Sequence, residues 1–449
     1  MVFNIPRYVE LIIDRLEEEG FSAYIVGGSV RDLLIGREPS DFDITTDALP
    51  EEIENIFSDF ITLEVGKKFG TIVIVQDEGI VEVTTFRTDG EYIDGRRPEK
   101  VYFSKNIFDD LSRRDFTINA MAYNKNIGIV DHFNGIKDLD RKIIKAVGKP
   151  QDRFKEDYLR IMRAIRFATQ LQFSIDKETF NACKLYSEHI SEISIERIRE
   201  EFFKTILSER PSYGIRMMKD IKILNIILPE LMKTIGFNQH NPHHDKDVFE
   251  HIMCVLDKTS PILHLRLGAL FHDIGKPSTL IIDENGVGHF YGHEKSGAKM
   301  AKEILKRWKA SNDIIDKVVM LIDKHMTQHS DLKEKGLKRL LSNFGEDDIF
   351  TLLELQKADR SCSNKEADIK DLLEREKKIK DIIRNKEVYE KNQLAINGSD
   401  VIKLGYKEGK IIGGILNYLF EKVLENPELN EREQLIDIVK EQFKIDSFG

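Results

Sequence analysis

Two acidic residues separated by one position, Asp41 and Asp43, stand in the string DFDITTD. Because successive side chains of a strand point to opposite faces, both carboxylates are expected on the same face. Two adjacent carboxylates repel each other unless a cation lies between them. Mg²⁺ is commonly held by one or two carboxylates together with substrate phosphates, so the pair predicts a magnesium site.

The residues that precede this pair could bind the phosphates. Gly27 and Gly28 allow backbone N–H groups to approach a ligand closely, and Ser29 is expected to start a helix whose positive end faces that ligand. Arg31 falls in the first turn of this helix, where its guanidinium could also reach a phosphate. Together with the acid pair, these residues predict a nucleoside-triphosphate site for two-metal phosphoryl transfer.

The strings GGSVRD and DFDITTD resemble the nucleotidyltransferase signature of the bacterial and eukaryotic class of tRNA CCA-adding enzymes and of bacterial poly(A) polymerases. The resemblance implies an α+β fold, in which a small polymerase-β-like mixed sheet with helices is followed by an all-α neck, body, HD and tail region. It also implies a third metal-binding carboxylate, for which Glu82 in the predicted strand GIVEVTTF is the candidate. The alternative for Glu82 is a polar residue on an exposed strand face.

A second motif, RRDFTINAMA, contains Arg113, Arg114 and Asp115 at the start of an amphipathic segment. Asn119 follows Asp115 by four residues, so a continuous helix would place both on one face. By the resemblance, this motif binds the triphosphate and the ribose. The alternative is a helical turn with two surface arginines.

In the helical pattern EDYLRIMRAIRF, Asp157 and Arg160 are expected to be neighbours on one helix face. The carboxylate could accept a hydrogen bond from the exocyclic amine of C or A, while the guanidinium donates to the adjacent ring nitrogen or carbonyl. U and G present a carbonyl there and would be rejected. The family motif implies this reading of the base, although a lone D-x-x-R is more often a salt bridge. Arg163 continues the face and could contact a phosphate or a stacked base.

Ten of the twelve histidines lie between His240 and His329. The order of His251, His272-Asp273 and Asp359 resembles the HD phosphohydrolase superfamily. Imidazole and carboxylate ligands suit Mn, Fe, Ni, Co or Mg. His293 and His325 stand where binuclear members hold a second metal, and the choice between one metal and two stays open.

The remaining features bear on which reaction is catalysed. The segment FRTDGEYIDGRRPEKVYF (86–103) resembles a flexible loop that is shortened in enzymes adding only CC, and it is not shortened here. The string GKKFGTIVIV is nearer to the CCA-adding form than to the GRRFRLVHV type of poly(A) polymerases. The leading prediction is therefore the addition of CCA to tRNA 3′ ends from CTP and ATP. The alternatives are an A-adding enzyme, a poly(A) polymerase, and a metal phosphohydrolase that acts through the HD residues.

The chain has 449 residues and a net charge of −10, which argues mildly against nucleic-acid binding but is outweighed by the motifs. The three cysteines, far apart and without pairing or metal-ligand spacing, suit a reducing cytosol. Neither a signal peptide nor a membrane span is expected, so the protein is predicted to be cytoplasmic, with its oligomeric state open. The expected domains are a head (1–145), a neck (146–235), an HD domain (236–365) and an RNA-contacting helical tail (366–449).

Overall fold

The computed structural model describes residues 3–90, 100–240, 247–330, 332–363 and 368–443. The chain forms two compact units, of which the first comprises Met1–Met232 with Arg307–Lys309. The second unit comprises Lys233–Lys306 and Ala310–Gly449. The finer division into head, neck, HD domain and tail stays a prediction.

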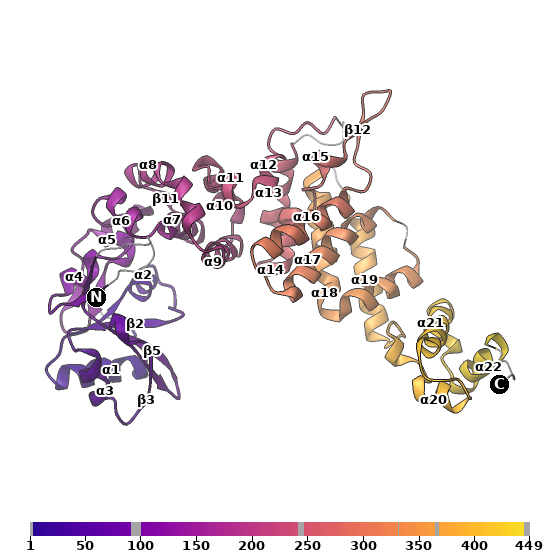
Figure 1. The fold of residues 1–449 in the computed structure, drawn as a ribbon, viewed down its shortest axis with the longest axis horizontal. Coiled ribbons are helices and arrows are strands. Elements are labelled where there is room, and N and C mark those ends of the chain that lie inside the picture. Colours follow the sequence, from indigo (N-terminus) through magenta and orange to yellow (C-terminus); the bar gives the residue numbers. More distant parts are fainter. Residues whose placement is uncertain (1–2, 91–99, 241–246, 331, 364–367, 444–449) are drawn as a thin grey trace. The chain divides into compact units, whose positions relative to one another are not determined.

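A seven-stranded sheet lies in the first unit, in the order β3-β4-β5-β2-β1-β8-β9. Strands β2, β3 and β5 of this sheet are labelled in Figure 1. β2 and β5 run parallel and the other neighbours are antiparallel, which confirms the predicted mixed sheet. Strands β1 and β2 are mostly buried, because their apolar and threonine side chains pack inside the head. The strands are β1 (Ala23–Val26), β2 (Phe42–Thr46), β3 (Ile61–Gly66), β4 (Thr71–Gln76), β5 (Gly79–Thr85), β8 (Ala122–Asn124) and β9 (Gly128–Val130).

Half of the predicted loop at 86–103, residues 91–99, lies outside the described residues. Its two described ends, β6 (Arg87–Asp89) and β7 (Val101–Phe103), pair as an antiparallel ladder. The expectation of a loop without regular structure was therefore wrong for these ends.

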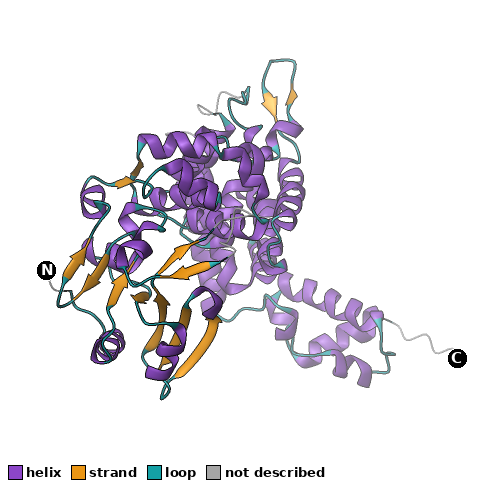
Figure 2. Ribbon diagram, turned by 60° about the vertical axis from the view of Figure 1, so that its left-hand side comes forward, coloured by secondary structure: helices purple, strands orange, loops and turns teal. Residues whose placement is uncertain are grey.

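The described part of the chain after the sheet is mostly helical (Figure 2). In the first unit, α7 packs against α9 and α10. Short β10 and β11 form a parallel ladder, of which β11 lies in the region expected to be all-α. The helices are α1 (Arg7–Glu18), α2 (Gly28–Leu34), α3 (Pro50–Ile56), α4 (Ile107–Ser112), α5 (Gly135–Asp140), α6 (Pro150–Glu156), α7 (Leu159–Leu171), α8 (Lys177–Leu185), α9 (Ile195–Ile206), α10 (Pro211–Asp220), α11 (Leu224–Ile227) and α12 (Pro229–Met232), with β10 (Ile143–Ile144) and β11 (Ser174–Ile175).

The second unit is built around α13, α14, α17 and α18, which pack against one another. A separate apolar core holds the last helices together and includes Val401, Leu419 and Leu435. The elements are α13 (Val248–Lys258), α14 (Leu263–Phe271), α15 (Lys276–Thr279), β12 (Ile281–Ile282), β13 (Gly288–His289), α16 (His293–Arg307), α17 (Asn312–Lys324), α18 (Glu334–Ser363), α19 (Lys370–Arg384), α20 (Gly398–Lys403), α21 (Lys410–Glu425) and α22 (Arg432–Gln442). In the described ranges, no helix has the length and apolar character that a membrane span requires.

Cys254 of α13 and Cys362 of α18 form a disulfide, with their Cα atoms 5.9 Å apart. The expectation that the cysteines are unpaired was therefore wrong. The two residues are separated by 108 positions in the sequence, and only the packing of α13 against α18 brings them together. Cys183 is buried as a free thiol.

Candidate functional site

One cavity of about 980 Å³ opens in the first unit. Its wall comes from α2, the segment before β2, the segment after α4, and helices α7 and α9. The lining residues are Gly27, Gly28, Arg31, Asp32, Arg37, Glu38, Ser40, Asp41, Asp43, Arg113, Arg114, Asp115, Asn119, Asp157, Leu159, Arg160, Arg163, Arg166, Phe167, Gln170, Leu171, Arg197, Lys204 and Ser208. The cavity thus brings together all the predicted triphosphate and base residues except Ser29.

The glycine pair sits at the turn from β1 into α2. Gly27 has φ +77° and ψ −132°, a conformation that is open essentially to glycine alone. A Cβ atom there would lie 2.9 Å from Nη1 of Arg114. Helix α2 begins at Gly28, and the hydroxyl of Ser29 is buried and donates to the Val26 carbonyl at 2.9 Å. Ser29 therefore supports the turn and does not face the cavity, contrary to the prediction.

Asp41 and Asp43 both reach the cavity, and the buried Phe42 lies between them at the start of β2. Glu82 on β5 is in register with Asp43 across the parallel pair. The surrounding protein, together with Glu82 and Asp41, raises the pKa of Asp43 to about 6 against the opposing charge of Arg114. Within the described ranges, groups of three ligand atoms all within 4.8 Å of one another occur in the second unit only, so these acids are further apart. An acid set of this kind fits a hard cation that also binds phosphate.

Two arginines of the cavity wall are fixed by one buried acid. Arg113 donates through Nε and Nη2 to Oδ1 of Asp110 at 3.0 and 2.7 Å, and Arg114 donates through Nη2 to Oδ2 at 3.1 Å. Burial alone would raise the pKa of Asp110, but the two guanidiniums outweigh it and lower the pKa. The sequence reasoning missed Asp110, although its i,i+3 and i,i+4 spacing to the arginines was a usable signal.

Asp115 and Asn119 touch each other, but not because they share a helix. Helix α4 ends at Ser112, and a 3₁₀ turn covers Thr117–Asn119. Asn119 donates through Nδ2 to Oδ1 of Asp115 at 3.2 Å and accepts from Nη1 of Arg31 at 2.8 Å. The condition of a continuous helix is therefore not met, although the two side chains do lie together.

Arg163 of α7 is bound to Asp115 through Nε at 2.7 Å and Nη2 at 2.6 Å. Burial would raise the pKa of Asp115, but Arg163 and Arg160 outweigh it and hold the pKa at about 2. Asp115 is thus a permanent carboxylate that orients Arg163 toward the cavity.

Asp157 and Arg160 are not on one helix face. Asp157 lies between α6 and α7 in an extended conformation (φ −152°, ψ 105°), and its Oδ1 accepts from the Leu159 N–H at 3.0 Å. This bond competes with helical continuation in the way that helix-capping aspartates do. Asp157 is instead paired with Arg197 of α9, and Arg160 is paired with Glu156 at 2.5 Å. Both predicted residues line the cavity, but their predicted placement on one helix face was wrong.

Helices α7 and α9 also contribute Arg166, Gln170, Arg197 and Lys204 to the cavity wall. Arg166 donates to Glu201 at 2.6 Å and to Gln170 at 2.9 Å, and its guanidinium lies 3.9 Å from the centre of the Phe167 ring. Burial lowers the pKa of Arg166, with Glu201 opposing. Only the contact between α7 and α9 reveals the Glu201 partner, because 35 positions separate it from Arg166.

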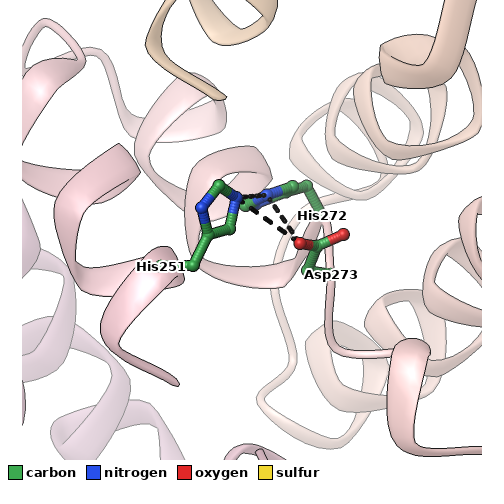
Figure 3. A group of neighbouring side chains, drawn as sticks. All are labelled: His251, His272 and Asp273. Atoms are coloured by element: carbon green, nitrogen blue, oxygen red, sulfur yellow. Dashed lines mark hydrogen bonds and ion pairs between the residues drawn. The ribbon is translucent and has the colours of Figure 1, made fainter. Parts of the chain in front are cut away.

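A second cluster lies in the second unit, where His251, His272 and Asp273 point toward one another (Figure 3). Nε2 of His251 lies 3.2 Å from Nε2 of His272 and 2.9 Å from Oδ1 of Asp359. Oδ2 of Asp273 lies 3.5 Å from His251 and 3.3 Å from His272. The four residues of the predicted H…HD…D set therefore meet at one point.

His293 and His325 meet on the other side of Asp273. Their Nε2 atoms are 3.2 Å apart, at 3.3 and 4.0 Å from Oδ1 of Asp273. Burial and the neighbouring His272 lower the pKa of His325 to about 4. Asp273 therefore offers one oxygen to each group of ligands, which fits two metal ions bridged by one carboxylate.

The orientation of the rings supports metal binding. The Nδ1 atoms of His272, His293 and His325 lie 2.7–2.8 Å from the carbonyls of Ala269, Phe290 and Ile322. A carbonyl only accepts, so each Nδ1 carries the proton and a neutral ring turns its Nε2 lone pair into the cluster. Lone pairs facing each other at about 3 Å need a cation or a proton between them. Two further side chains contact the carboxylates of the cluster: Nζ of Lys276 lies 2.7 Å from Oδ2 of Asp273, and Nε2 of Gln328 donates to Oδ2 of Asp359 at 2.5 Å.

Three stretches of the chain match family models. These are the poly A polymerase head domain at residues 23–145, the probable RNA and SrmB-binding site of polymerase A at 172–234, and the putative tRNA nucleotidyltransferase domain 2 at 293–439. The first match spans the sheet and the cavity residues from Gly27 to Asn119.

Similar proteins extend over the whole chain. The CCA-adding enzyme of Ligilactobacillus salivarius is 32% identical over 450 residues, covering 98% of each chain. The CCA-adding enzyme of Lactobacillus gasseri is 50% identical over 206 residues, covering 45% of this chain and 51% of that protein. The crystal structure of the Bacillus stearothermophilus CCA-adding enzyme in complex with CTP matches with a TM-score of 0.71 and 26% identity, covering 98% of this chain and 99% of that one. This chain therefore belongs to the family of CCA-adding enzymes, and it is a nucleotidyltransferase.

Proposed function

We propose that this nucleotidyltransferase adds C, C and A to the 3′ end of tRNA, without a nucleic-acid template, from CTP and ATP. The observation that carries the proposal is a cavity in the first unit that is lined together by the glycine turn, the acid pair, the RRD string and the Asp157–Arg160 segment. The names of the relatives support the same reaction. A cytoplasmic location of this activity is part of the proposal.

The triphosphate is assigned to the cationic side of the cavity. Arg113 and Arg114 are fixed by the buried Asp110, so their orientation is set before a ligand arrives. The backbone at Gly27 and Gly28 is free of side chains and permits close approach of phosphate oxygens. These groups would hold the phosphates in line with an attacking hydroxyl, which is the main task in phosphoryl transfer.

Asp41, Asp43 and Glu82 are proposed to hold Mg²⁺, which would activate the 3′-hydroxyl of the RNA and offset the charge of the leaving pyrophosphate. Their placement across β2 and β5 and the raised pKa of Asp43 support this assignment. Asp43→Asn and Asp41→Asn should each reduce incorporation by a factor of about 100 or more, in line with the loss of a large transition-state contribution.

Asp157 and Arg160 are proposed to read the base. The carboxylate can only accept and the guanidinium can only donate, so C and A, which carry an amine next to a ring acceptor, complement the pair. A base with a carbonyl in the place of the amine leaves that carbonyl against the carboxylate, and an unmatched buried polar contact of this kind is costly.

Three tRNA transcripts, ending before CCA, after C and after CC, test the proposal when CTP and ATP are supplied singly and together. Extension of all three to one CCA end is expected. Extension of only the CC-ended transcript would make the protein an A-adding enzyme. Long A tails on unrelated RNA would make it a poly(A) polymerase.

The last helices are proposed to contact the RNA. Lys403, Lys407 and Lys410 are all exposed beside the start of α21 and could pair with phosphates. Replacing the three by Glu should raise the KM for tRNA and leave the KM for CTP unchanged. Equal changes in both would contradict this role.

The histidine cluster favours a second activity, a metal-dependent phosphohydrolase in the second unit. The sharing of Asp273 between two ligand groups supports this proposal. Two divalent metal ions so held would supply a nucleophilic hydroxide at neutral pH and charge for the departing phosphate. Asp273→Asn should release both metal equivalents, measured by elemental analysis of the purified protein, and should abolish hydrolysis of 2′,3′-cyclic nucleotides with Mn²⁺, Ni²⁺ or Co²⁺. Retention of both metals in this variant would refute the bridged site.

A further inference from the structure

The two residues proposed to read the base are each held by another side chain. The Asp157 carboxylate accepts hydrogen bonds from both terminal nitrogens of Arg197, a residue of α9 that lies 40 positions further along the sequence. The Arg160 guanidinium donates to the Glu156 carboxylate and to two backbone carbonyls, those of Arg153 at 3.1 Å and Arg113 at 3.2 Å. The two residues share a backbone hydrogen bond, from the Arg160 N–H to the Asp157 carbonyl at 3.0 Å, but each side chain is held by other groups.

The contact between Arg197 and Asp157 has the geometry of a two-point clamp. Nη2 of Arg197 lies 2.6 Å from Oδ2 and Nη1 lies 3.3 Å from Oδ1. The Leu159 N–H adds a third bond, to Oδ1 at 3.0 Å. A guanidinium that contacts both oxygens fixes the plane of the carboxylate, and a fork of this kind cannot be reproduced by a single ammonium group.

The clamp is largely protected from water and faces the cavity. The side chains of Arg197 and Asp157 retain 22% and 14% of their exposed area, and both line the same cavity wall. Each carboxylate oxygen can accept more than one hydrogen bond, so the clamp leaves acceptor capacity for a ligand. Arg197 therefore sets the direction of that capacity without using all of it.

We infer that Arg197 is a positioning residue that determines base specificity, because it holds the Asp157 carboxylate in the one orientation that accepts from an exocyclic amine. This inference rests on the proposed reading of the base by Asp157. Without the clamp, the carboxylate could rotate away from a mismatched carbonyl, and the penalty against U would fall. Triphosphate binding, which uses other residues, should change less.

The test measures single-nucleotide incorporation into a tRNA transcript that lacks CCA, with CTP and with UTP. In Arg197→Gln, the ratio of kcat/KM for CTP over UTP should fall on the order of tenfold or more, the scale of one well-made discriminating hydrogen bond. Arg197→Lys should restore only part of the ratio, because an ammonium can engage one oxygen well. A purely structural role would lower both kcat/KM values together and leave the ratio unchanged, which would refute the inference.

Two further variants separate the possible failures. Arg199→Gln removes a guanidinium from the same helix whose contacts go to the Trp308 and Lys309 carbonyls, and it should keep the CTP-over-UTP ratio of the parent protein. Asp157→Asn, which replaces one acceptor oxygen with a donor, should collapse the ratio. If Asp157→Asn keeps the ratio, the proposed reading of the base is wrong. If it collapses the ratio and Arg197→Gln does not, only the role of Arg197 is wrong.

Discussion

Replacing Asp115 with Asn should destabilise the first unit strongly at neutral pH. The Asp115 carboxylate is 8% exposed and accepts from the Phe116 N–H, from Asn119 and from two nitrogens of Arg163. The Asn variant has the same shape but removes the charge and turns an NH₂ group toward a neighbouring donor. The decrease in the free energy of unfolding should therefore be at least as large as the electrostatic stabilisation of the Asp115 carboxylate in the folded protein.

The lowered pKa of Asp115 sets the magnitude. The pKa is about 2 in the folded protein, against an ordinary value of 3.8 for an aspartate. A difference of about two pKa units corresponds to about 2 to 3 kcal/mol at pH 7. Because the folded pKa is lowered, this stabilisation is complete above about pH 5 and is lost as the pH falls from about 4 toward 2. At pH 3, roughly half of it should remain.

The only tryptophan makes the assay specific for this unit. Trp308 is buried against Phe202 and donates to the Ile227 carbonyl, so its fluorescence should report unfolding of the first unit in urea. Asp59→Asn is the matched control, because Asp59 forms a similar two-point pair with Arg15 at the exposed surface. The control should lose much less stability than the Asp115 variant. Equal losses in the two variants, or a loss for Asp115→Asn that is the same at pH 7 and pH 3, would refute the reasoning.

Three other outcomes follow from the structure. The unreduced, unfolded chain should show one free thiol, and three free thiols would contradict the disulfide. The double variant Cys254→Ser with Cys362→Ser should destabilise the second unit by up to about 5 kcal/mol, because the disulfide closes a loop of over 100 residues. Urea unfolding followed by circular dichroism measures this loss. Gly27→Ala should cost about 1 to 3 kcal/mol of backbone strain and raise the KM for CTP, and an unchanged KM would show that this turn does not bound the triphosphate site. Asp110→Asn should lower the melting temperature and weaken nucleotide binding measured by calorimetry. The reason is that the guanidiniums of Arg113 and Arg114 lose their shared partner, at a cost of about 3 to 5 kcal/mol. An unchanged affinity for the nucleotide would contradict the assignment of both arginines to the triphosphate.

Several features were predictable from the sequence because they depend on near neighbours. The glycine turn, the acid pair on either side of Phe42, and the strand that carries Glu82 all follow from local spacing and strand alternation. The H…HD…D order likewise pointed to a metal cluster, and the structure brings its members together. The break of the helix at Asp157 was the local feature that the spacing argument missed, because a capping aspartate and a helical one look alike in a D-x-x-R string.

The sequence alone therefore specifies the set of chemical groups and their order along the chain, and near-neighbour pairs such as Asp110 with Arg113 follow from local spacing. Pairs between distant residues depend on the tertiary structure. Arg197 reaches Asp157 because α9 packs on α7, and Cys254 reaches Cys362 because α13 packs on α18. Asp273 divides its two oxygens between two pairs of histidines from different helices. Ion pairs and metal ligands interact over a few ångströms, and the residue types alone do not show which distant residues will be partners. These partners are set only when burial of the apolar faces has fixed which helices are in contact.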